Sequence, residues 1–249
     1  MLFKVLGSGH GHPVTQRFSS SILLDVDGGL YLLDCGEPCA ATLTWAGYSA
    51  HELRAVFVSH MHIDHVSGIF GLIKTMHLAG CSGECTFCMP QGGITPVADF
   101  LPAVHLDPQH LSFALTFVPI DDEQVVYQDD RLKIMAYESG HTQESFSFVL
   151  TIHGRRIVWT ADLPHDFHRL PPLLEQPTDL LISELTHINL DDYLPCLAAS
   201  SIDRILFTHV HEDHVSEESV FSKRARAVIK ETPFIVARDG TEVALEKKR

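Results

Sequence analysis

Four residues of metal-ligand type stand within one short segment: His60, His62, Asp64 and His65 follow an apolar run of the chain. Imidazole nitrogen and carboxylate oxygen bind zinc and neighbouring divalent metals at about 2.0 to 2.2 Å. His60 and His62 can point to one side of the segment and Asp64 and His65 to another, so one loop could supply two adjacent ions. A solvent-exposed, histidine-rich turn is the alternative, but four such residues after a buried-looking strand favour a metal site.

A second histidine-rich segment echoes the first. Residues 58–67 are matched in pattern by residues 207–216, and each copy follows an apolar strand and precedes a helix-like segment. The repeat predicts two related halves that each end a core strand with a histidine. His211, Asp213 and His214 leave open a further metal site, although polar residues at the start of a helix explain them as well.

The elements that must position these residues form a mixed α/β pattern. Short β-branched or Leu-rich runs predict strands, and longer segments with helical apolar spacing predict helices. The expected strands are 3–6, 21–25, 30–34, 55–59, 112–119, 131–138, 145–152, 157–161, 180–183, 204–208 and 234–237. The expected helices are 38–46, 65–78, 93–101, 166–174, 191–199 and 217–230. No linker of Gly, Ser or Pro divides the chain, so we expect a single domain over residues 1–249.

Composition narrows the class of protein. The 249 residues are 45% hydrophobic and 20% charged, which is ordinary for a globular protein, and they include 17 histidines, which favours a metal enzyme. A formal charge of -14 argues against a nucleic-acid polymer or an anionic membrane as partner. Without a signal-like N-terminus or a membrane-length apolar run, and with six cysteines, we expect a cytoplasmic protein. The residues leave open whether it forms a homodimer.

The chain resembles the metallo-β-lactamase-fold superfamily. Its HxHxDH motif is matched by the segment from His60 to His65, and the family's other positions are matched in order by Asp34, His141, Asp162 and His209. The resemblance spans nearly the whole chain. It implies an αββα sandwich made of two pseudo-symmetric halves.

The resemblance also implies the roles of the ligands. It assigns His60, His62 and His141 to one metal ion, Asp64, His65 and His209 to a second, and Asp162 to a bridge between them. Zinc is the metal expected, and manganese and iron are alternatives that the same ligands accept.

Two residues beside these ligands carry further expectations. Asp34 is expected to orient a ligand histidine by a hydrogen bond, which sets ring angle and tautomer; a simple strand-end turn is the alternative. Ala161 departs from the commoner form of the family, since many members have glycine before the bridging aspartate.

Two metals that share a water lower its pKa toward neutrality, so a dinuclear hydrolase is the expected enzyme. Asp64 and Asp162 would hold the attacking hydroxide. Similar segments of phosphodiesterase-type members place a histidine or a glutamate after the corresponding strand, which makes His187 and Glu184 the candidates for delivering a proton to the leaving group. An exposed loop histidine capped on Glu184 is the alternative interpretation of His187.

The opening segment indicates the branch of the superfamily. Gly7-Ser8-Gly9-His10-Gly11-His12 resembles the glycine-rich first turn of phosphodiesterase-type members, such as the tRNA 3′-processing endonucleases and the phosphonate-pathway cyclic phosphodiesterases. Glycines permit close backbone approach to a phosphate, and His10, His12 and His211 are candidates for substrate contact. The short interval between His141 and Asp162 leaves no room for the long basic arm of the bacterial tRNA-processing enzymes. A small phosphodiester is therefore the expected substrate.

Alternatives remain open. The same site could cleave a thioester or lactone, or the chain could be a non-catalytic, regulatory metal-binding protein of the same fold. Iron-dependent, oxygen-using members are disfavoured, because a persulfide dioxygenase uses one iron and a flavodiiron protein needs a flavodoxin domain. Cys81, Cys85 and Cys88 have the spacing of a radical-SAM cluster, but they fall between complete superfamily motifs, and residues 84–88 are expected to form a short strand. A peripheral zinc is the lesser alternative.

Overall fold

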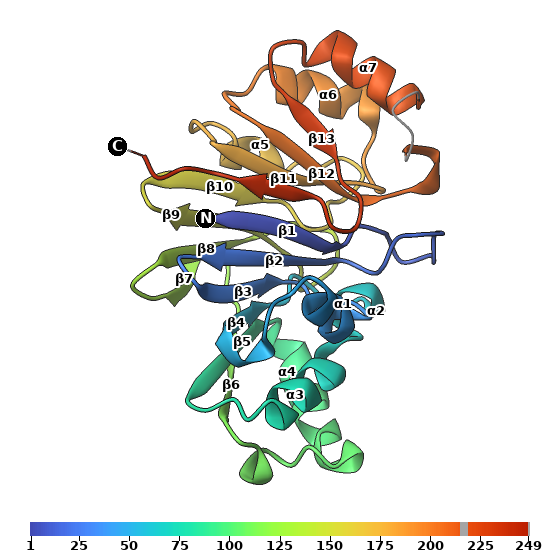
Figure 1. The fold of residues 1–249 in the computed structure, drawn as a ribbon. Helices are drawn as coiled ribbons and strands as arrows, with labels where there is room; N and C mark the ends of the chain where they lie inside the picture. The colour runs from blue at the N-terminus through green and yellow to red at the C-terminus, as the bar shows by residue number, and fades with distance from the viewer. Residues whose placement is uncertain (215–218, 249) are drawn as a thin grey trace. The chain divides into compact units, whose positions relative to one another are not determined.

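The computed structural model describes residues 1–214 and 219–248, and the chain divides into two compact units. Unit 1 comprises Met1–Asp121 and Arg238–Glu246, and unit 2 comprises Asp122–Ala237 and Lys247–Arg249. Each unit holds one seven-stranded sheet and its own helices (Figure 1). The two units, with one sheet each, agree with the two halves predicted from the sequence. That the chain is a single domain stays a prediction.

The sheet of unit 1 has the order β14-β1-β2-β3-β4-β5-β6. Its strands are β1 (Leu2–Gly7), β2 (Ser21–Val26), β3 (Gly29–Leu33), β4 (Leu53–Phe57), β5 (Glu84–Met89), β6 (Ala114–Pro119) and β14 (Glu242–Ala244). Pairing is antiparallel from β14 to β3 and parallel from β3 to β6. The carboxyl ends of β3 and β4 therefore lie side by side, and the segment from His60 to His65 follows this edge.

Helices of unit 1 pack on one face of that sheet. They are α1 (Cys39–Trp45), α2 (Ile63–Val66), α3 (Ile69–Leu78) and α4 (Gln91–Phe100), with the short 3-10 helices η1 (Ala50–Glu52), η2 (Pro102–Val104) and η3 (Pro108–His110). Alternate strand residues point to the same face. Leu30 and Leu32 of β3 accordingly share a buried cluster with Leu72 and Met76 of α3.

The sheet of unit 2 has the order β13-β12-β11-β10-β9-β8-β7. Its strands are β7 (Gln124–Gln128), β8 (Leu132–Glu138), β9 (Phe146–Ile152), β10 (Arg155–Trp159), β11 (Leu180–Leu185), β12 (Ile205–Val210) and β13 (Phe234–Val236). The pairs from β10 to β13 are parallel, and those from β7 to β10 are antiparallel. The carboxyl ends of β10, β11 and β12 thus lie at one edge.

Helices α5 (Leu170–Leu173), α6 (Leu190–Ala198) and α7 (Val220–Val228) belong to unit 2, with the 3-10 turn η4 (Glu212–His214). Tyr193 and Leu197 of α6 and Phe221 of α7 share a buried cluster with Leu181 and Phe207 of the sheet, and Figure 1 shows both helices beside β12 and β13. None of the helices in the described ranges is long and apolar enough to cross a membrane.

Some expected elements differ from those observed. The helix expected over 65–78 is split into α2 and α3 at Gly68, whose N–H donates to the Cys35 carbonyl at 2.8 Å instead of continuing one helix. The helix expected over 166–174 shrinks to α5, which contains two consecutive prolines. β7 and β14 were not predicted. Helix α7 covers the middle of the expected helix 217–230, whose first two residues lie outside the described ranges.

Candidate metal centre

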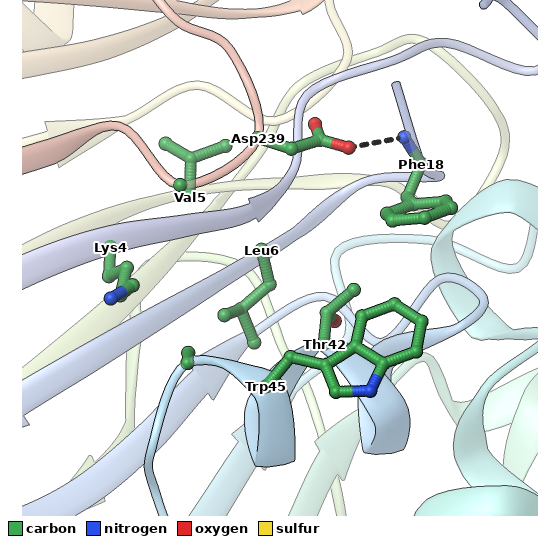
Figure 2. Close-up of a pocket in the computed structure, with 9 residues that line it drawn as sticks. Lys4, Val5, Leu6, Phe18, Thr42, Trp45 and Asp239 are labelled. Atoms are coloured by element: carbon green, nitrogen blue, oxygen red, sulfur yellow. Dashed lines mark hydrogen bonds between the residues drawn. The ribbon is translucent and has the colours of Figure 1, made fainter. Parts of the chain in front are cut away.

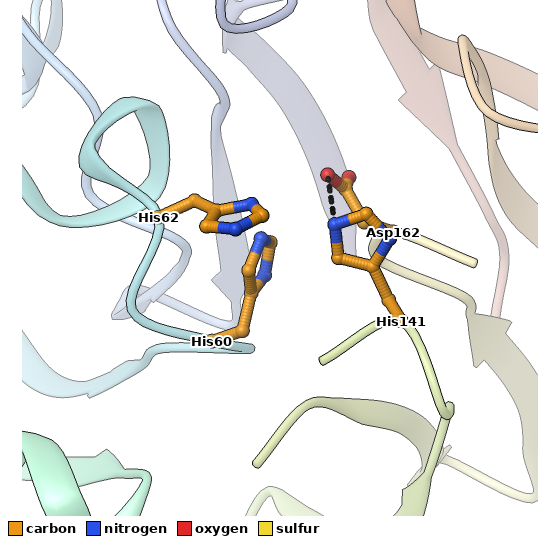
Figure 3. A group of neighbouring side chains, drawn as sticks. All are labelled: His60, His62, His141 and Asp162. Carbon is orange, nitrogen blue, oxygen red and sulfur yellow. Dashed lines mark ion pairs between the residues drawn. The ribbon is translucent and has the colours of Figure 1, made fainter. Parts of the chain in front are cut away.

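In unit 1, the segment after β4 gathers three histidine rings. The His60 ring lies 4.6 Å from that of His62, edge to face, and 4.2 Å from that of His65. Figure 3 shows His60 and His62 side by side on this segment. His60 and His65 are buried, His62 is exposed, and the Asp64 carboxylate lies 3.4 Å from His65 Nε2. All four predicted ligands of this unit therefore stand together.

Asp34 and Ser59 set the tautomers of two of these rings. Asp34 Oδ2 lies 2.6 Å from His65 Nδ1, and a carboxylate at that distance favours the tautomer with its proton on Nδ1. Ser59 Oγ donates to Asp34 Oδ2 at 3.1 Å, so it can only accept from His60 Nδ1, which lies 3.0 Å away. In both rings Nε2 is then the nitrogen with a lone pair for a metal. Sequence reasoning anticipated Asp34 and missed Ser59, because a serine at a strand end is too common to stand out.

The glycine-rich segment also belongs to unit 1, in the loop between β1 and β2. A Cβ built on Gly11 would lie 3.4 Å from Asp64 Oδ2, so the backbone of this loop reaches a predicted ligand. His10 and His12 flank that contact, with ring centroids 6.3 Å apart. Their candidacy for substrate contact is consistent with this placement and stays a prediction.

In unit 2, His141 and Asp162 form one pair. His141 Nε2 lies 3.7 Å from Asp162 Oδ2, as the dashed line in Figure 3 marks, and His141 Nδ1 lies 3.3 Å from the Leu163 carbonyl. Since a carbonyl only accepts, His141 carries its proton on Nδ1 and offers Nε2 as a ligand atom. Asp162 is buried.

Glu184 organises the end of β11. One carboxylate oxygen accepts from the Leu163 N–H at 2.6 Å, and the other accepts from the N–H groups of Thr186 and His187 at 2.9 and 2.8 Å. The same carboxylate lies 3.0 Å from His187 Nδ1. Through these hydrogen bonds Glu184 holds the backbone of two loops and the His187 ring. Glu184 is buried, whereas His187 is partly exposed and so remains accessible to a ligand.

His209 completes the cluster of unit 2. Its Nδ1 lies 3.5 Å from Asp162 Oδ1, and the His187 ring lies 5.5 Å from the His209 ring and 4.6 Å from that of His141. Asp162, Glu184, His187 and His209 can each direct one ligand atom so that all lie within 4.8 Å of one another. A donor set of imidazoles and carboxylates in this space suits zinc, manganese or iron, so the residues fit a divalent metal.

Three non-glycine residues at these strand ends have left-handed backbone conformations: Asp34, Ala161 and His209, with φ of 59°, 49° and 50°. Such conformations are costly for residues with a Cβ and collect at functional sites. Glycine alone adopts this conformation freely, which agrees with the glycine that the resemblance implies at the position of Ala161.

The cysteine motif does not form a centre. Cys85 and Cys88 are three positions apart on β5, so they point to opposite faces of the sheet. Both are buried, and burial raises the pKa of the Cys85 and Cys88 thiols, the latter to about 12. Cys81 precedes the strand and hydrogen-bonds the Ala50 carbonyl. These neutral, diverging thiols are unsuited to a metal.

The histidines after β12 are less organised. His211 is half-buried and lies 3.4 Å from the Oδ2 atom of the exposed Asp213, and its ring is 6.3 Å from that of His214. Within residues 1–214 and 219–248, these residues do not form one of the groups of three metal-ligand side chains. Asp213 and His214 lie in the 3-10 turn η4, and α7 begins at Val220, so the interpretation of these residues as a helix start stays a prediction.

The amino-acid sequence is similar to a protein family and to several ribonucleases. The family described as Anti-Pycsar protein Apyc1 matches residues 1–192. A ribonuclease Z of Bacteroides fragilis is 26% identical over 261 residues, which cover 97% of this chain and 84% of that enzyme. The chain spans about half the length of several other ribonuclease Z relatives.

Solved structures share the fold. The metallo-β-lactamase fold protein YhfI of Bacillus subtilis has a TM-score of 0.80 and 21% identity, covering 97% of this chain and 98% of that one. Zinc-bound PqqB of Methylobacterium extorquens has a TM-score of 0.77 and 17% identity, covering 98% of this chain and 100% of that one.

These comparisons confirm the predicted metallo-β-lactamase fold and the prediction that the chain is a metal-dependent hydrolase. Metal binding occurs in a protein of this fold, and this chain offers His and Asp residues for it. The ribonuclease relatives lend no support to the expectation that excludes nucleic-acid polymers, which stays a prediction.

Proposed function

The chain belongs to the Anti-Pycsar protein Apyc1 family, and on this premise we propose that it hydrolyses a small phosphodiester at a centre of two divalent metal ions. His60, His62 and His141 would hold one ion, and Asp64, His65 and His209 the other. Asp162 would be shared by both. Zinc is the ion we assign, because three imidazoles on one ion and two on the other suit it well.

The observation that carries this proposal is the cluster at the carboxyl ends of β10, β11 and β12. There one side-chain atom from each of four residues lies within 4.8 Å of the others: Asp162 and His209, which we assign as ligands, and Glu184 and His187, which we assign to proton delivery. Carboxyl ends of parallel strands are where α/β sheets place their ligands. The histidine segment after β4 stands at the corresponding edge of the other sheet, and its tautomers already suit a metal.

When bound, the two ions lower the pKa of a water and neutralise negative charge that develops on the phosphoryl oxygens. The chain supplies the remaining tasks. Asp64 and Asp162 accept hydrogen bonds from the attacking water and orient it. His187, with Nδ1 held by Glu184, uses Nε2 to give a proton to the departing oxygen. Glu184 is a positioning residue, since it fixes the His187 ring and the backbone on either side of the site.

The net charge supports a small substrate. A protein with a charge of -14 repels a polyanion along its length, whereas a compound with one phosphodiester brings a single negative charge. The ribonuclease relatives make RNA the second candidate, and thioesters or lactones are the third, because an activated water also attacks acyl carbon.

An activity panel tests the substrate class. Protein loaded with zinc, manganese or iron is offered bis-p-nitrophenyl phosphate, cyclic mononucleotides, a precursor tRNA, a thioester and a lactone. We expect turnover of the small phosphodiesters above all others. Cleavage confined to the thioester or lactone would refute the proposal, and preferential cleavage of the tRNA would replace it with the second candidate.

Metal stoichiometry tests the ligand assignment. We expect about two ions per chain in the unaltered protein and fewer in Asp162→Ala and His209→Ala. Lys133→Ala on β8 serves as a control outside the proposed site. If both variants retain two ions, the ligand assignment is wrong.

A separate variant tests the proton donor. His187→Ala should keep both ions and lose about 10²- to 10⁴-fold in kcat, with a smaller loss for a substrate whose leaving group needs no proton. Comparing bis-p-nitrophenyl phosphate with an alkyl diester measures that difference. Equal losses for the two substrates would contradict the role of His187 as proton donor.

A further inference from the structure

The glycine-rich loop between β1 and β2 is closed at its base. The Gly9 N–H donates to the Phe18 carbonyl at 2.8 Å, and the Arg17 N–H donates to the Val14 carbonyl at 3.2 Å. The chain therefore leaves β1 after Gly7 and comes back beside Gly9 at Phe18, shortly before β2 begins at Ser21. The intervening residues project as one loop that carries His10, Gly11 and His12.

One carboxylate joins both ends of this loop. Asp239 Oδ1 accepts from the Ser8 N–H at 2.8 Å and from the Ser8 hydroxyl at 2.7 Å, while Asp239 Oδ2 accepts from the Phe18 N–H at 2.8 Å. Figure 2 shows the bond to Phe18. Arg17 strengthens the closure, because its buried guanidinium donates to Ser8 Oγ at 2.7 Å. Asp239 is remote in sequence and lies beyond the residues that match the family.

The loop reaches a proposed metal ligand. Its backbone at Gly11 comes so near Asp64 that an added Cβ would lie 3.4 Å from the carboxylate oxygen. Any displacement of the base would shift this contact as well as His10 and His12. Backbone N–H groups of glycine-rich loops bind phosphate oxygens, so the exact position of this loop matters for a phosphodiester.

We propose that Asp239 is a positioning residue of the phosphodiesterase site: by joining Ser8 to Phe18, it holds the loop from Gly9 to Arg17 against Asp64 and so fixes the part of the site that receives the phosphate. The inference rests on the proposed function. Closing a flexible loop in advance removes the entropy that substrate binding would otherwise have to offset. Loss of the carboxylate should therefore weaken substrate binding more than it slows the chemical step.

A pocket beside this closure provides a spectroscopic readout. Its volume is about 280 Å³, and Leu6, Phe18, Trp45 and Asp239 are among its lining residues (Figure 2). The Phe18 and Trp45 rings are 6.2 Å apart, and Trp45 is 72% exposed. The other tryptophan, Trp159, is buried against Phe148. A Trp159→Phe background therefore leaves Trp45 to report on the position of Phe18.

Kinetics of Asp239→Ala and Asp239→Asn in the metal-loaded, full-length chain test the proposal. We expect KM for bis-p-nitrophenyl phosphate to rise about tenfold or more in Asp239→Ala, with a smaller change in kcat and an unchanged metal content. Asp239→Asn keeps one acceptor oxygen, so its KM should lie between those of the wild type and Asp239→Ala. Asp129→Ala is the matched control, because Asp129 accepts from two backbone N–H groups in the turn between β7 and β8.

Hydrogen exchange and Trp45 emission separate a local opening from general destabilisation. In Asp239→Ala, exchange at the Gly9 and Phe18 amides should accelerate and Trp45 emission should shift, while strands β3 and β4 keep their protection. An active wild-type enzyme with an Asp239→Ala variant that keeps the wild-type KM would overturn this inference alone. A wild-type enzyme inert toward phosphodiesters would overturn the proposed function instead.

Discussion

At the scale of single residues, the strand ends that carry the candidate ligands hold strained backbone conformations and the hydrogen bonds that set histidine tautomers. Ala161 and Asp34 both have φ values in the left-handed region, at 49° and 59°. Ala161 precedes the proposed bridging Asp162, and Asp34 sets the tautomer of His65. A substitution of Ala161 can therefore test the backbone strain alone, and a substitution of Asp34 can test the hydrogen bond to His65.

Ala161→Gly should stabilise the protein. A left-handed alanine costs about 1 to 2 kcal/mol, which exceeds the added backbone entropy of glycine in the unfolded chain. We expect the free energy of unfolding to rise by about 0.5 to 1 kcal/mol, measured by urea denaturation. Ala136→Gly, in the middle of β8, should lower it by about 1 kcal/mol. A loss of stability in Ala161→Gly equal to that control would show that the alanine is not strained.

Asp34→Asn should weaken metal binding without altering the backbone, because asparagine tolerates the left-handed region. Asp34 Oδ1 accepts from the Ser59 N–H at 2.8 Å and Oδ2 pairs with His65 Nδ1. An amide has one acceptor, so one of these contacts is lost or His65 shifts its proton to Nε2. Metal affinity should fall about 10- to 100-fold in competition titrations with a chelator. Asp25→Asn is the control, and equal affinities in both variants would contradict the role of Asp34.

At the scale of elements, a buried carboxylate ties together three parts of unit 2. Asp179, just before β11, accepts from Arg155 Nη1 at 2.7 Å, from the Arg156 N–H at 2.8 Å and from Lys248 Nζ at 3.0 Å. Burial would raise the pKa of Asp179, but the hydrogen bonds from Arg156, Lys248 and Arg155 hold that pKa below its ordinary value. These hydrogen bonds join the start of β10, the start of β11 and the C-terminal segment.

Acid should remove this contribution. A carboxyl with a lowered folded pKa stabilises the fold above its unfolded pKa of about 3.9 and stops doing so as pH falls through the folded pKa. The difference in unfolding free energy between wild type and Asp179→Asn should therefore be constant from pH 7 to 5 and shrink below pH 4. Urea denaturation at each pH measures it, with the exposed Asp99→Asn in α4 as a control. A difference that stays the same down to pH 3 would contradict the assignment.

Elements with strong apolar patterns could be predicted from sequence, and those defined by tertiary contacts could not. β11 was expected over 180–183 and is observed over Leu180–Leu185, because every residue of this run is buried. β7 has mostly exposed or half-buried side chains at the sheet edge, so its sequence lacks a strand pattern. The break between α2 and α3 depends on the Cys35 carbonyl, which captures the Gly68 N–H from a distant segment.

The candidate site was more predictable than the elements around it. Residues of metal-ligand type carry their chemistry in the side chain itself, so spacing and resemblance could propose His60, His141 and Asp162 as ligands, and their assignment stays a prediction. Asp239 and Ser59 could not, because their roles arise from hydrogen bonds to residues that the fold brings near. Supporting residues of this kind become visible only with three-dimensional contacts.

At the scale of the whole molecule, the charge of -14 predicts how salt should affect each class of substrate. Electrostatic forces reach about 30 Å at 0.01 M salt and about 10 Å at 0.1 M. A polyanion feels repulsion from many protein charges within the longer range, whereas a small phosphodiester carries a single charge. Raising salt should therefore increase kcat/KM for RNA by screening that repulsion and change it much less for bis-p-nitrophenyl phosphate.

Measuring kcat/KM for both substrates between 0.01 and 0.2 M salt tests this expectation. The small substrate is the internal control, because salt effects on the metal ions or on stability would alter both rates alike. A basic nucleic-acid-binding surface behaves in the opposite way, since counterion release makes its binding to RNA weaken steeply with salt. RNA cleavage that falls with salt while cleavage of the small phosphodiester stays constant would therefore reveal a local cationic path for RNA and favour the second candidate function.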